Sequence, residues 1–427
     1  MYCDKIKLAV FLLSFLFVLQ FTTVSGQPND DLLGPVGQFG GEATVGTVDG
    51  DYVYLSQGKG ISVLDNTSES FTQLGYLELP EQSLALLKSG NLLFSLLNNN
   101  QGFYVIDVSD PSFPQIVGSC EIGANWSAGM AQHGQYVYVA AGQGGFRIID
   151  VSSPSAPVIA STVNLFYPSD VAIAGNYAFA LTSTSSPAVL HVFDLTNPLQ
   201  PVFRNQVTVA KGRKLTLNGD LALIACSEYT GGENGMRLFD ISDPQNPTEK
   251  SYLKTVKKAN NILTWDNTAY IACEDSLIMA DISAPTAPSV IGRYDVPGPS
   301  FSSTRGVFTD GRLVYLTTLY ADRPLVAVDV SNPAQPREDR TQFLPDNIQS
   351  LKAQGDRLFV TGTSFLFVYD IADRANPRFL TLYPEFAALS ALQMYNGYLS
   401  GARGSDLYFL DIQDSQNISA AGQYTLP

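Results

Sequence analysis

An aspartate recurs through this chain, each time at the end of a short run of apolar residues. The nine members lie 41 to 48 residues apart and are Asp65, Asp107, Asp150, Asp194, Asp240, Asp281, Asp329, Asp370 and Asp411. Carboxylates can act as general acids and bases or can bind cations. A period near 40 residues is nevertheless typical of stacked or radial repeats, in which such a residue shapes each unit. We therefore expect the nine carboxylates to be spread around a repeat architecture.

Histidines and short motifs give little support for catalysis. Only His133 and His191 are present, which is too few for a histidine metal cluster. The sequence has neither a Gly-x-Ser-x-Gly nucleophile motif nor a phosphate-binding Gly-x-x-x-x-Gly-Lys-Ser/Thr motif. An acid pair of the glycosidase type stays open. We predict no catalytic residue, no metal and no cofactor, with a carboxylate-dependent hydrolase or lyase acting on polysaccharide as the alternative function.

The elements that must position these residues are short β-strands. The third unit, residues 128–160, shows four such runs, and a Gly134-Gln135 pair joins the first two. No helical periodicity holds for 10–12 residues. Four antiparallel strands per unit, repeated many times, are typical of a β-propeller. The sequence predicts an all-β fold, a single β-propeller of eight or nine four-stranded blades, closed either by residues 34–39 or by residues 418–424.

The recurrent aspartate precedes a turn. Its carboxylate can accept hydrogen bonds from backbone N–H groups of that turn. Prolines four and seven residues later, such as Pro154 and Pro157 after Asp150, fix φ. The first and ninth units lack both prolines, as terminal repeats often differ from the rest. We assign all nine aspartates a structural role in turns.

Three segments carry a family resemblance. Phe-Arg-Ile-Ile-Asp-Val-Ser at 146–152, Phe-Tyr-Val-Ile-Asp-Val-Ser at 103–109 and Leu-Val-Ala-Val-Asp-Val-Ser at 325–331 resemble the LVIVD repeat of bacterial secreted and surface proteins. The resemblance extends over essentially all of residues 40–427. It implies a β-propeller that works outside the cytoplasm, and it implies no established activity.

The N-terminus has the features of a signal peptide. Lys5 and Lys7 precede an apolar run from Leu8 to Phe21, and small residues follow before Gln27. We expect a signal peptide over 1–26, an N-terminal segment over 27–42 and a propeller of nine repeats over 43–427. The protein would be secreted, periplasmic or on the cell surface, with no transmembrane span after signal removal. A net charge of −15 argues against nucleic-acid binding, and we expect a monomer.

Three cysteines follow the predicted signal peptide: Cys120, Cys226 and Cys273. An odd number cannot pair fully within one chain. Cys226 and Cys273 fall at equivalent points of successive units, so a disulfide between them is one alternative. We favour buried free thiols that pack as small apolar residues.

Departures from the repeat identify candidate binding residues. Counting back six residues from each hairpin glycine, or its equivalent, predicts a ring near one channel mouth: Thr44, Leu84, Ala128, Ser169, Arg213, Asn260, Arg305, Gln349 and Ser390. Units five to seven concentrate cations there, and units three and four add aromatic residues. Arginine can bind an anion with a fork of donors, and aromatic faces stack on sugars. The predicted ligand-binding residues are Trp126, Tyr167, Arg213, Lys258, Asn260 and Arg305.

These patterns predict an exported, non-catalytic β-propeller that acts as a binding scaffold for a protein or glycan at the channel mouth. A hydrated mouth without a ligand and a purely structural adhesion module remain open alternatives.

Overall fold

The computed structural model describes residues 42–99, 102–123, 129–183, 187–209, 211–227, 233–297, 304–319, 323–345, 348–373 and 377–426. The expected signal peptide and residues 27–41, with the proposed closing strand at 34–39, lie outside these ranges. The described residues form β-strands and two 3-10 turns, η1 (Gly142–Gly144) and η2 (Pro384–Phe386). Within these ranges no helix is long and apolar enough to cross a membrane.

Nine four-stranded antiparallel sheets follow one another along the chain, each built from four consecutive strands. Sheet 1 has β1 (Ala43–Asp49), β2 (Tyr52–Gln57), β3 (Gly60–Asp65) and β4 (Thr72–Glu78). Sheet 2 has β5 (Ser83–Ser89), β6 (Leu92–Leu97), β7 (Phe103–Asp107) and β8 (Gln115–Cys120). Sheet 3 has β9 (Gly129–His133), β10 (Tyr136–Ala140), β11 (Phe146–Asp150) and β12 (Val158–Val163). Sheet 4 has β13 (Pro168–Ala174), β14 (Tyr177–Thr182), β15 (Ala188–Asp194) and β16 (Val202–Val209).

The remaining sheets repeat this plan. Sheet 5 has β17 (Gly212–Asn218), β18 (Leu221–Cys226), β19 (Gly235–Asp240) and β20 (Thr248–Lys254). Sheet 6 has β21 (Ala259–Trp265), β22 (Thr268–Cys273), β23 (Ser276–Asp281) and β24 (Ser289–Asp295). Sheet 7 has β25 (Thr304–Thr309), β26 (Leu313–Thr318), β27 (Leu325–Asp329) and β28 (Arg337–Gln342). Sheet 8 has β29 (Ser350–Gln354), β30 (Arg357–Thr361), β31 (Leu366–Asp370) and β32 (Arg378–Tyr383), and sheet 9 has β33 (Ser390–Tyr395), β34 (Tyr398–Arg403), β35 (Asp406–Asp411) and β36 (Ser419–Thr425).

The recurrent aspartates end the third strand of every sheet and form the turn that follows. Each carboxylate accepts a hydrogen bond from the backbone N–H two residues later, over 2.7 to 3.0 Å. This is the geometry of an Asx-turn, in which a side-chain oxygen replaces a backbone acceptor. The nine carboxylates are therefore engaged locally, one per sheet.

Such turns pack against the sheet before them, as two pairs of neighbouring sheets show. The fourth strand of every sheet has a β-bulge opposite the third strand, and in sheet 2 the bulge brings Gly118 against the carbonyl oxygen of Pro154 in the turn of sheet 3. At the same position of sheet 5, the Ser251 hydroxyl donates to the carbonyl of Pro285 over 2.6 Å. The aspartate turn thus connects neighbouring sheets as well as neighbouring strands.

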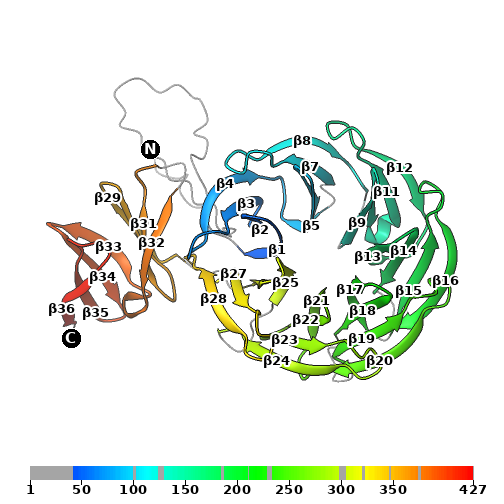
Figure 1. Cartoon of the computed structure of the whole chain (residues 1–427). Coiled ribbons are helices and arrows are strands. Elements are labelled where there is room, and N and C mark those ends of the chain that lie inside the picture. Colours follow the sequence, from blue (N-terminus) through cyan, green and yellow to red (C-terminus); the bar gives the residue numbers. More distant parts are fainter. Residues whose placement is uncertain are drawn as a thin grey trace, which may run out of the picture. The chain divides into compact units, whose positions relative to one another are not determined.

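Seven sheets follow one another around a ring (Figure 1). Sheet 1 packs against sheet 7 as well as sheet 2, since Val53 and Leu55 share a core cluster with Tyr315 and Leu325. This contact between sheets 1 and 7 is the seam at which the ring closes, and across it the Thr317 hydroxyl donates to the carbonyl of Thr44 over 2.9 Å.

Arg340 completes this seam. It lies at the bulge of β28, the position that Gly118 has in β8. Its Nη2 donates to the carbonyl and to Oδ1 of Asn66, over 3.0 and 2.9 Å, and its guanidinium lies over the ring of Phe71. The turn of sheet 1 therefore packs against sheet 7, in the same way as the turns of the other ring sheets pack against the sheet before them.

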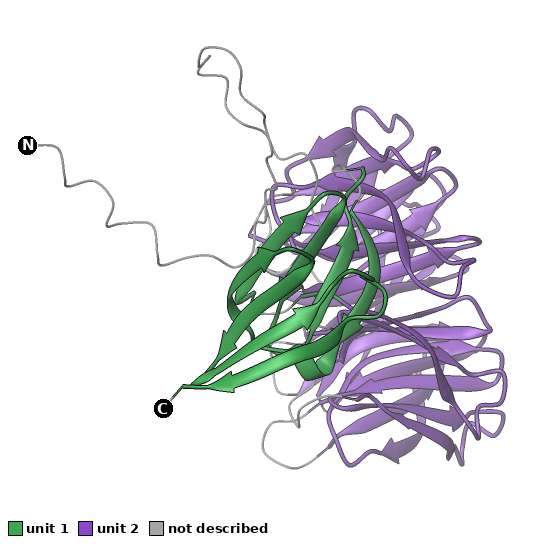
Figure 2. Ribbon diagram, turned by 90° about the vertical axis from the view of Figure 1, so that its left-hand side faces the viewer, with its two compact units in different colours: residues 1–41, 344–427 green, residues 42–343 purple. Residues whose placement is uncertain are grey.

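The number of sheets agrees with the sequence-based count of nine, but their arrangement does not agree with a single ring of eight or nine blades. The chain divides into two compact units, one of residues 42–343 with sheets 1–7, and one that contains the described residues from 344 to 426 with sheets 8 and 9 (Figure 2). The physical reason is that the turn of sheet 1 fits the β28 bulge, which leaves no place in the ring for sheet 8. Sheet 9 is completed by its own β36.

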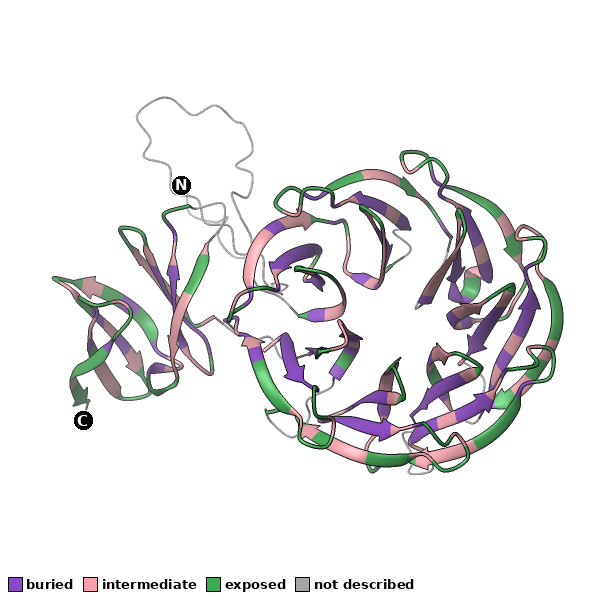
Figure 3. Ribbon diagram, in the orientation of Figure 1, coloured by how far each residue is buried: buried purple, intermediate pink, exposed green. Residues whose placement is uncertain are grey.

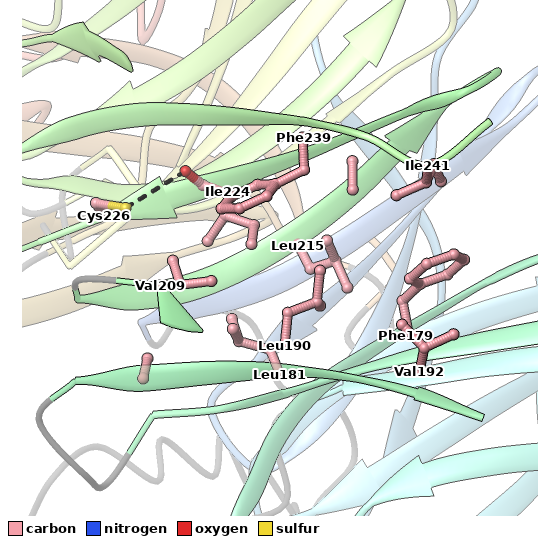
Figure 4. Close-up of a cluster of buried hydrophobic side chains, with 12 residues drawn as sticks. Phe179, Leu181, Leu190, Val192, Val209, Leu215, Ile224, Cys226, Phe239 and Ile241 are labelled. Atoms are coloured by element: carbon pink, nitrogen blue, oxygen red, sulfur yellow. Dashed lines mark hydrogen bonds between the residues drawn. The ribbon is translucent and has the colours of Figure 1, made fainter. Parts of the chain in front are cut away.

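The core lies between successive sheets. Figure 4 shows one such layer, where Phe179, Leu190 and Val192 of sheet 4 meet Ile224 and Phe239 of sheet 5. Cys226 belongs to this layer, and Cys273 lies in the next layer along the ring. Both thiols, like that of Cys120, are free, which confirms the preference for free thiols over a disulfide. Burial raises the pKa of Cys226 to about 11 and that of Cys273 to about 12.

Candidate functional site

The first strands of the seven ring sheets line a central cavity of about 150 Å³. Each strand contributes the residue five positions before its hairpin glycine or the equivalent: Val45, Ala85, Gly129, Asp170, Lys214, Asn261 and Gly306. Hairpin residues with positive φ, such as Gly175 at 54° and Asp266 at 50°, set this common register. Because these seven positions hold six different residue types, the chemistry of the layer differs from one side of the channel to the other.

A β-bulge lies at the same end of most first strands. In β17 the pairing shifts between Gly212 and Lys214, and in β21 it shifts between Ala259 and Asn261. The extra residues are Arg213 and Asn260, and β-bulges of this kind redirect side chains at the rims of β-structures. The predicted register is therefore present in the ring, where these residues occupy the second position of their strands.

Asp170 and Lys214 form an ion pair in the cavity wall, with 3.7 Å between Oδ1 and Nζ. Asp170 is buried, and its carboxylate also accepts the backbone N–H groups of Leu215 at 2.9 Å and of Val171 at 3.1 Å. Gly129 leaves room for it, since a Cβ there would lie 1.9 Å from Oδ1. Burial raises the pKa of Asp170, while Lys214 and the two N–H groups act in the opposite direction. The carboxylate thereby connects sheets 3, 4 and 5.

Arg213, Asn260 and Arg305 lie on the first strands of sheets 5, 6 and 7. Arg213 Nη1 donates to Oδ1 of Asn260 over 3.2 Å, and Asn260 Nδ2 donates to the carbonyl of Thr304 over 3.0 Å. Arg213 and Arg305 are exposed. Within the described ranges neither guanidinium has a carboxylate within salt-bridge distance. The arrangement presents two solvated cations on either side of a fixed amide.

The other cations of this region are partly balanced by acids. Lys258 Nζ lies 3.1 Å from Glu274 and Lys257 Nζ lies 3.7 Å from Asp275. Glu274 belongs to the connection between β22 and β23, and its backbone N–H donates to the carbonyl of Lys258. Lys258 directly precedes β21, and a carboxylate already accompanies its charge.

Tyr167 precedes β13 at the same mouth. Its hydroxyl accepts a hydrogen bond from Gln143 Nε2 over 2.5 Å, and its ring meets that of Phe166 edge-on. The residue has φ of 49°, in the left-handed region that few non-glycine residues adopt. Backbone strain of this kind is often retained where a side chain must be aimed. Trp126, its predicted aromatic partner, lies outside the described residues, as does Ala128.

The predicted ring of nine mouth residues is corrected to the seven sheets of the ring. Gln349 and Ser390 belong to the unit of sheets 8 and 9 and are not part of this channel. Asp170 was missed by the sequence reasoning, although the signal was present. At its register position it is the sole acid among seven residues that include Lys214 and Asn261.

The described residues contain no group of three or more His, Cys, Asp or Glu side chains placed to hold a metal ion. The site consists of a small polar cavity whose wall contains the ion pair of buried Asp170 with half-buried Lys214, and of exposed arginines and an aromatic residue at the mouth. Such an arrangement can bind an anionic or hydroxyl-rich group through forked donors and a planar face.

Solved structures share the fold at low sequence identity. Hydrazine synthase of Kuenenia stuttgartiensis is similar with a TM-score of 0.56 and 12% identity, over 72% of this chain and 99% of that one. Sqt1 of Saccharomyces cerevisiae gives 0.53 and 8%, over 81% and 97%. A hypothetical selenium-binding protein of Sulfolobus tokodaii gives 0.52 and 14%, over 71% and 91%. These similarities support the β-propeller fold alone.

Comparison with curated proteins gave no match. The LVIVD repeat family matches five stretches, residues 97–122, 128–165, 214–255, 257–296 and 320–341. All five contain segments of the ring sheets described above, and each includes the aspartate of a repeat turn that the structure shows. The chain is therefore an LVIVD repeat-containing protein.

Proposed function

We propose that this protein is an exported, non-catalytic binding scaffold that holds an anionic glycan or an acidic macromolecule at the channel mouth of its seven-sheet ring. One observation carries the proposal: Arg213 and Arg305 extend into solvent on either side of Asn260, at positions where the repeat itself specifies no residue. The chain has 25 Lys and Arg against 40 Asp and Glu, so two exposed arginines on neighbouring sheets, with no described carboxylate within salt-bridge distance, depart from its overall acidity. Their presence together favours recognition of negative charge.

The small cavity next to the two arginines suggests how a ligand would bind. A volume of about 150 Å³ holds one sugar-sized or carboxylate-sized group rather than a whole ligand. The Lys214 ammonium and the Asn261 amide reach the cavity wall, while the arginines stand above it. We infer that the ligand inserts one polar group and spreads its remaining charge over sheets 5 to 7.

Tyr167 would contribute a stacking face. It stands on the side of sheet 4, where its hydroxyl is held by Gln143. Fixing the ring in this way lowers the entropy that binding would otherwise cost. Aromatic rings beside hydrogen-bonding groups are common in sites for small hydroxyl-rich ligands.

A carboxylate-dependent hydrolase would need more than this cavity offers. Glycosidases use two carboxyl groups about 5 to 9.5 Å apart. Among the cavity residues that the structure describes, Asp170 is the one acid, and its oxygens already accept two backbone N–H groups. Turnover of a polysaccharide by the protein would therefore contradict the proposed function and favour the enzyme.

Binding to a glycan array and to extracellular acidic polymers, with three single variants, tests the proposal. Arg213→Ala and Arg305→Ala should each weaken retention at least about tenfold, because each removes a forked cation from the mouth. Arg312→Ala is the matched control. Arg312 is also exposed, on the hairpin that follows Gly311 at the opposite end of β25. Identical profiles for all three variants and the parent protein would show that the mouth is not the site.

A further inference from the structure

All four strands of sheet 9 carry exposed and half-buried residues (Figure 3), and one of the two faces of the sheet is covered. On the covered face, Leu399 and Leu410 are fully buried against Phe359 and Val368 of sheet 8. Alternate residues of the same strands point the other way. That second face corresponds to the one by which each ring sheet packs on the sheet that follows it.

Exposure shows that nothing described covers this second face. Phe409 is 42% exposed, whereas the equivalent residue of every ring sheet is completely buried. Those equivalents are Val63, Val105, Ile148, Val192, Leu238, Met279 and Ala327. Cross-strand pairs place Tyr398 and Tyr395 on this face through Ser400 and Phe409, and Tyr424 through its pairing with Leu407.

The β36 bulge gives an independent sign. Gly422 occupies the position of Gly118 and Gly292, each of which has a turn of the next sheet directly against it. A Cβ on Gly422 would find no atom within 4 Å. Sheet 9 therefore keeps the sequence features of an internal blade while its neighbour position is vacant in the described chain.

The charge of the face favours one kind of occupant. Tyr395, Tyr398, Phe409, Tyr424 and Leu426 are uncharged, and so are Ser400, Leu407 and Gly422, which the strand pairing places on the same face. The one carboxylate at the margin, that of Asp411, accepts the backbone N–H of Gln413 over 3.0 Å. In a chain of net charge −15, two copies can approach without strong repulsion where such charges are absent.

The open face of sheet 9 determines how two copies can meet. Two sheet 9 faces can meet across a two-fold axis, which is the commonest symmetry of homo-oligomers. We propose that the open face of β33–β36 is a homodimer interface in which the sheet 9 faces of two copies pack together.

The apolar area of the open face determines how strongly the two copies are expected to bind each other. If each fully exposed large side chain presents about 200 Å², the five apolar residues expose roughly 500 Å² per copy. Two copies then bury about 1,000 Å², the lower end of what specific interfaces need. The dimer is accordingly weak and dissociates on dilution.

Sedimentation equilibrium of the purified protein, from ~1 μM to ~500 μM, measures this equilibrium. The parent protein should show a reversible monomer–dimer transition. Tyr395→Glu and Tyr424→Glu should each raise the dissociation constant at least about tenfold, because they bring like charges to the centre of the contact. Phe113→Glu is the control, since Phe113 is 66% exposed in the ring unit and should leave the constant unchanged.

Both tyrosines are more than half exposed in the single chain, so the variants should fold, and circular dichroism checks that they do. A monomer at every concentration overturns the proposal, and then another protein or another part of this chain covers the face. A dimer that the two tyrosine variants leave intact overturns it equally, as do open-ended polymers.

Discussion

Replacing Gly118 with alanine tests how the turn of one sheet packs against the sheet before it. A Cβ at Gly118 would lie 2.2 Å from the carbonyl oxygen of Pro154 and 2.9 Å from Cδ of Pro157. Ordinary contacts begin near 3.4 Å, so the turn would have to retreat by about 1 Å. The Asx hydrogen bond of Asp150 to Ser152 holds that turn in place and resists the shift.

The cost should fall at the upper end of overpacking penalties, about 3 kcal/mol, because the obstructing atoms are backbone and ring atoms rather than a flexible side chain. Gly422→Ala is the matched control, since it occupies the same repeat position with no atom within 4 Å. It should be neutral or stabilise the protein by up to ~0.5–1 kcal/mol, the usual gain when glycine leaves a strand.

Equilibrium urea unfolding measures both effects. The two tryptophans of the chain, Trp126 and Trp265, belong to the ring unit, so their fluorescence follows that unit alone, while far-UV circular dichroism follows both units. We expect Gly118→Ala to shift the fluorescence transition to lower urea. Measurements at low protein concentration keep the chain monomeric. Equal small effects of the two substitutions would refute the role of the turn in holding neighbouring sheets together.

Three further predictions concern stability and thiol reactivity. Arg340→Ala should destabilise the ring unit by about 3 kcal/mol, because it leaves buried carbonyl groups between sheets 1 and 7 without a hydrogen-bond donor. Arg337→Ala on the same strand should cost less than ~1 kcal/mol, because that side chain is 78% exposed. Urea unfolding compares the two variants, and equal losses of stability would contradict the role of Arg340 in closing the ring. The side-chain hydroxyl and N–H of Ser331, then Arg337, lower the pKa of Asp329 to about 2, so its stabilisation is complete above the unfolded pKa near 3.9 and is lost as pH falls towards 2; unfolding free energy that stays constant across this window would contradict it. Burial should keep Cys226 and Cys273 unreactive towards a thiol reagent at pH 8 until denaturant is added, and rapid labelling of native protein would show that the core layers open.

Local signals explain the part of the fold that the sequence predicts. Hairpin glycines that need positive φ, the Asx-turn aspartates and the alternation of apolar residues each act within a few positions. They placed the nine four-stranded units and put Arg213 and Asn260 in the correct register of their strands. The same signals carried the LVIVD resemblance, which the five matched stretches confirm.

Closure of the ring depends on residues far apart in the chain. Arg340 and Asn66 are separated by 274 positions, and no local pattern says that they meet. A cue exists in retrospect, because an arginine replaces the glycine, serine or asparagine that stands at this bulge in sheets 1 to 6. The role of Asp170 was not predicted for a related reason. Its carboxylate contacts Gly129 and accepts the backbone N–H of Leu215, and both residues belong to neighbouring sheets.

The binding proposal for the channel mouth rests on recognition of negative charge. The most direct measurement is calorimetric titration of the protein with one uronic-acid glycan and with the same glycan after its carboxylates have been reduced to alcohols. The account predicts binding of the acidic form that weakens with added salt, at least about tenfold weaker binding of the reduced form, and loss of this preference in an Arg213→Ala, Arg305→Ala double variant. Equal affinity for the two forms, or a preference that survives in the double variant, would contradict it.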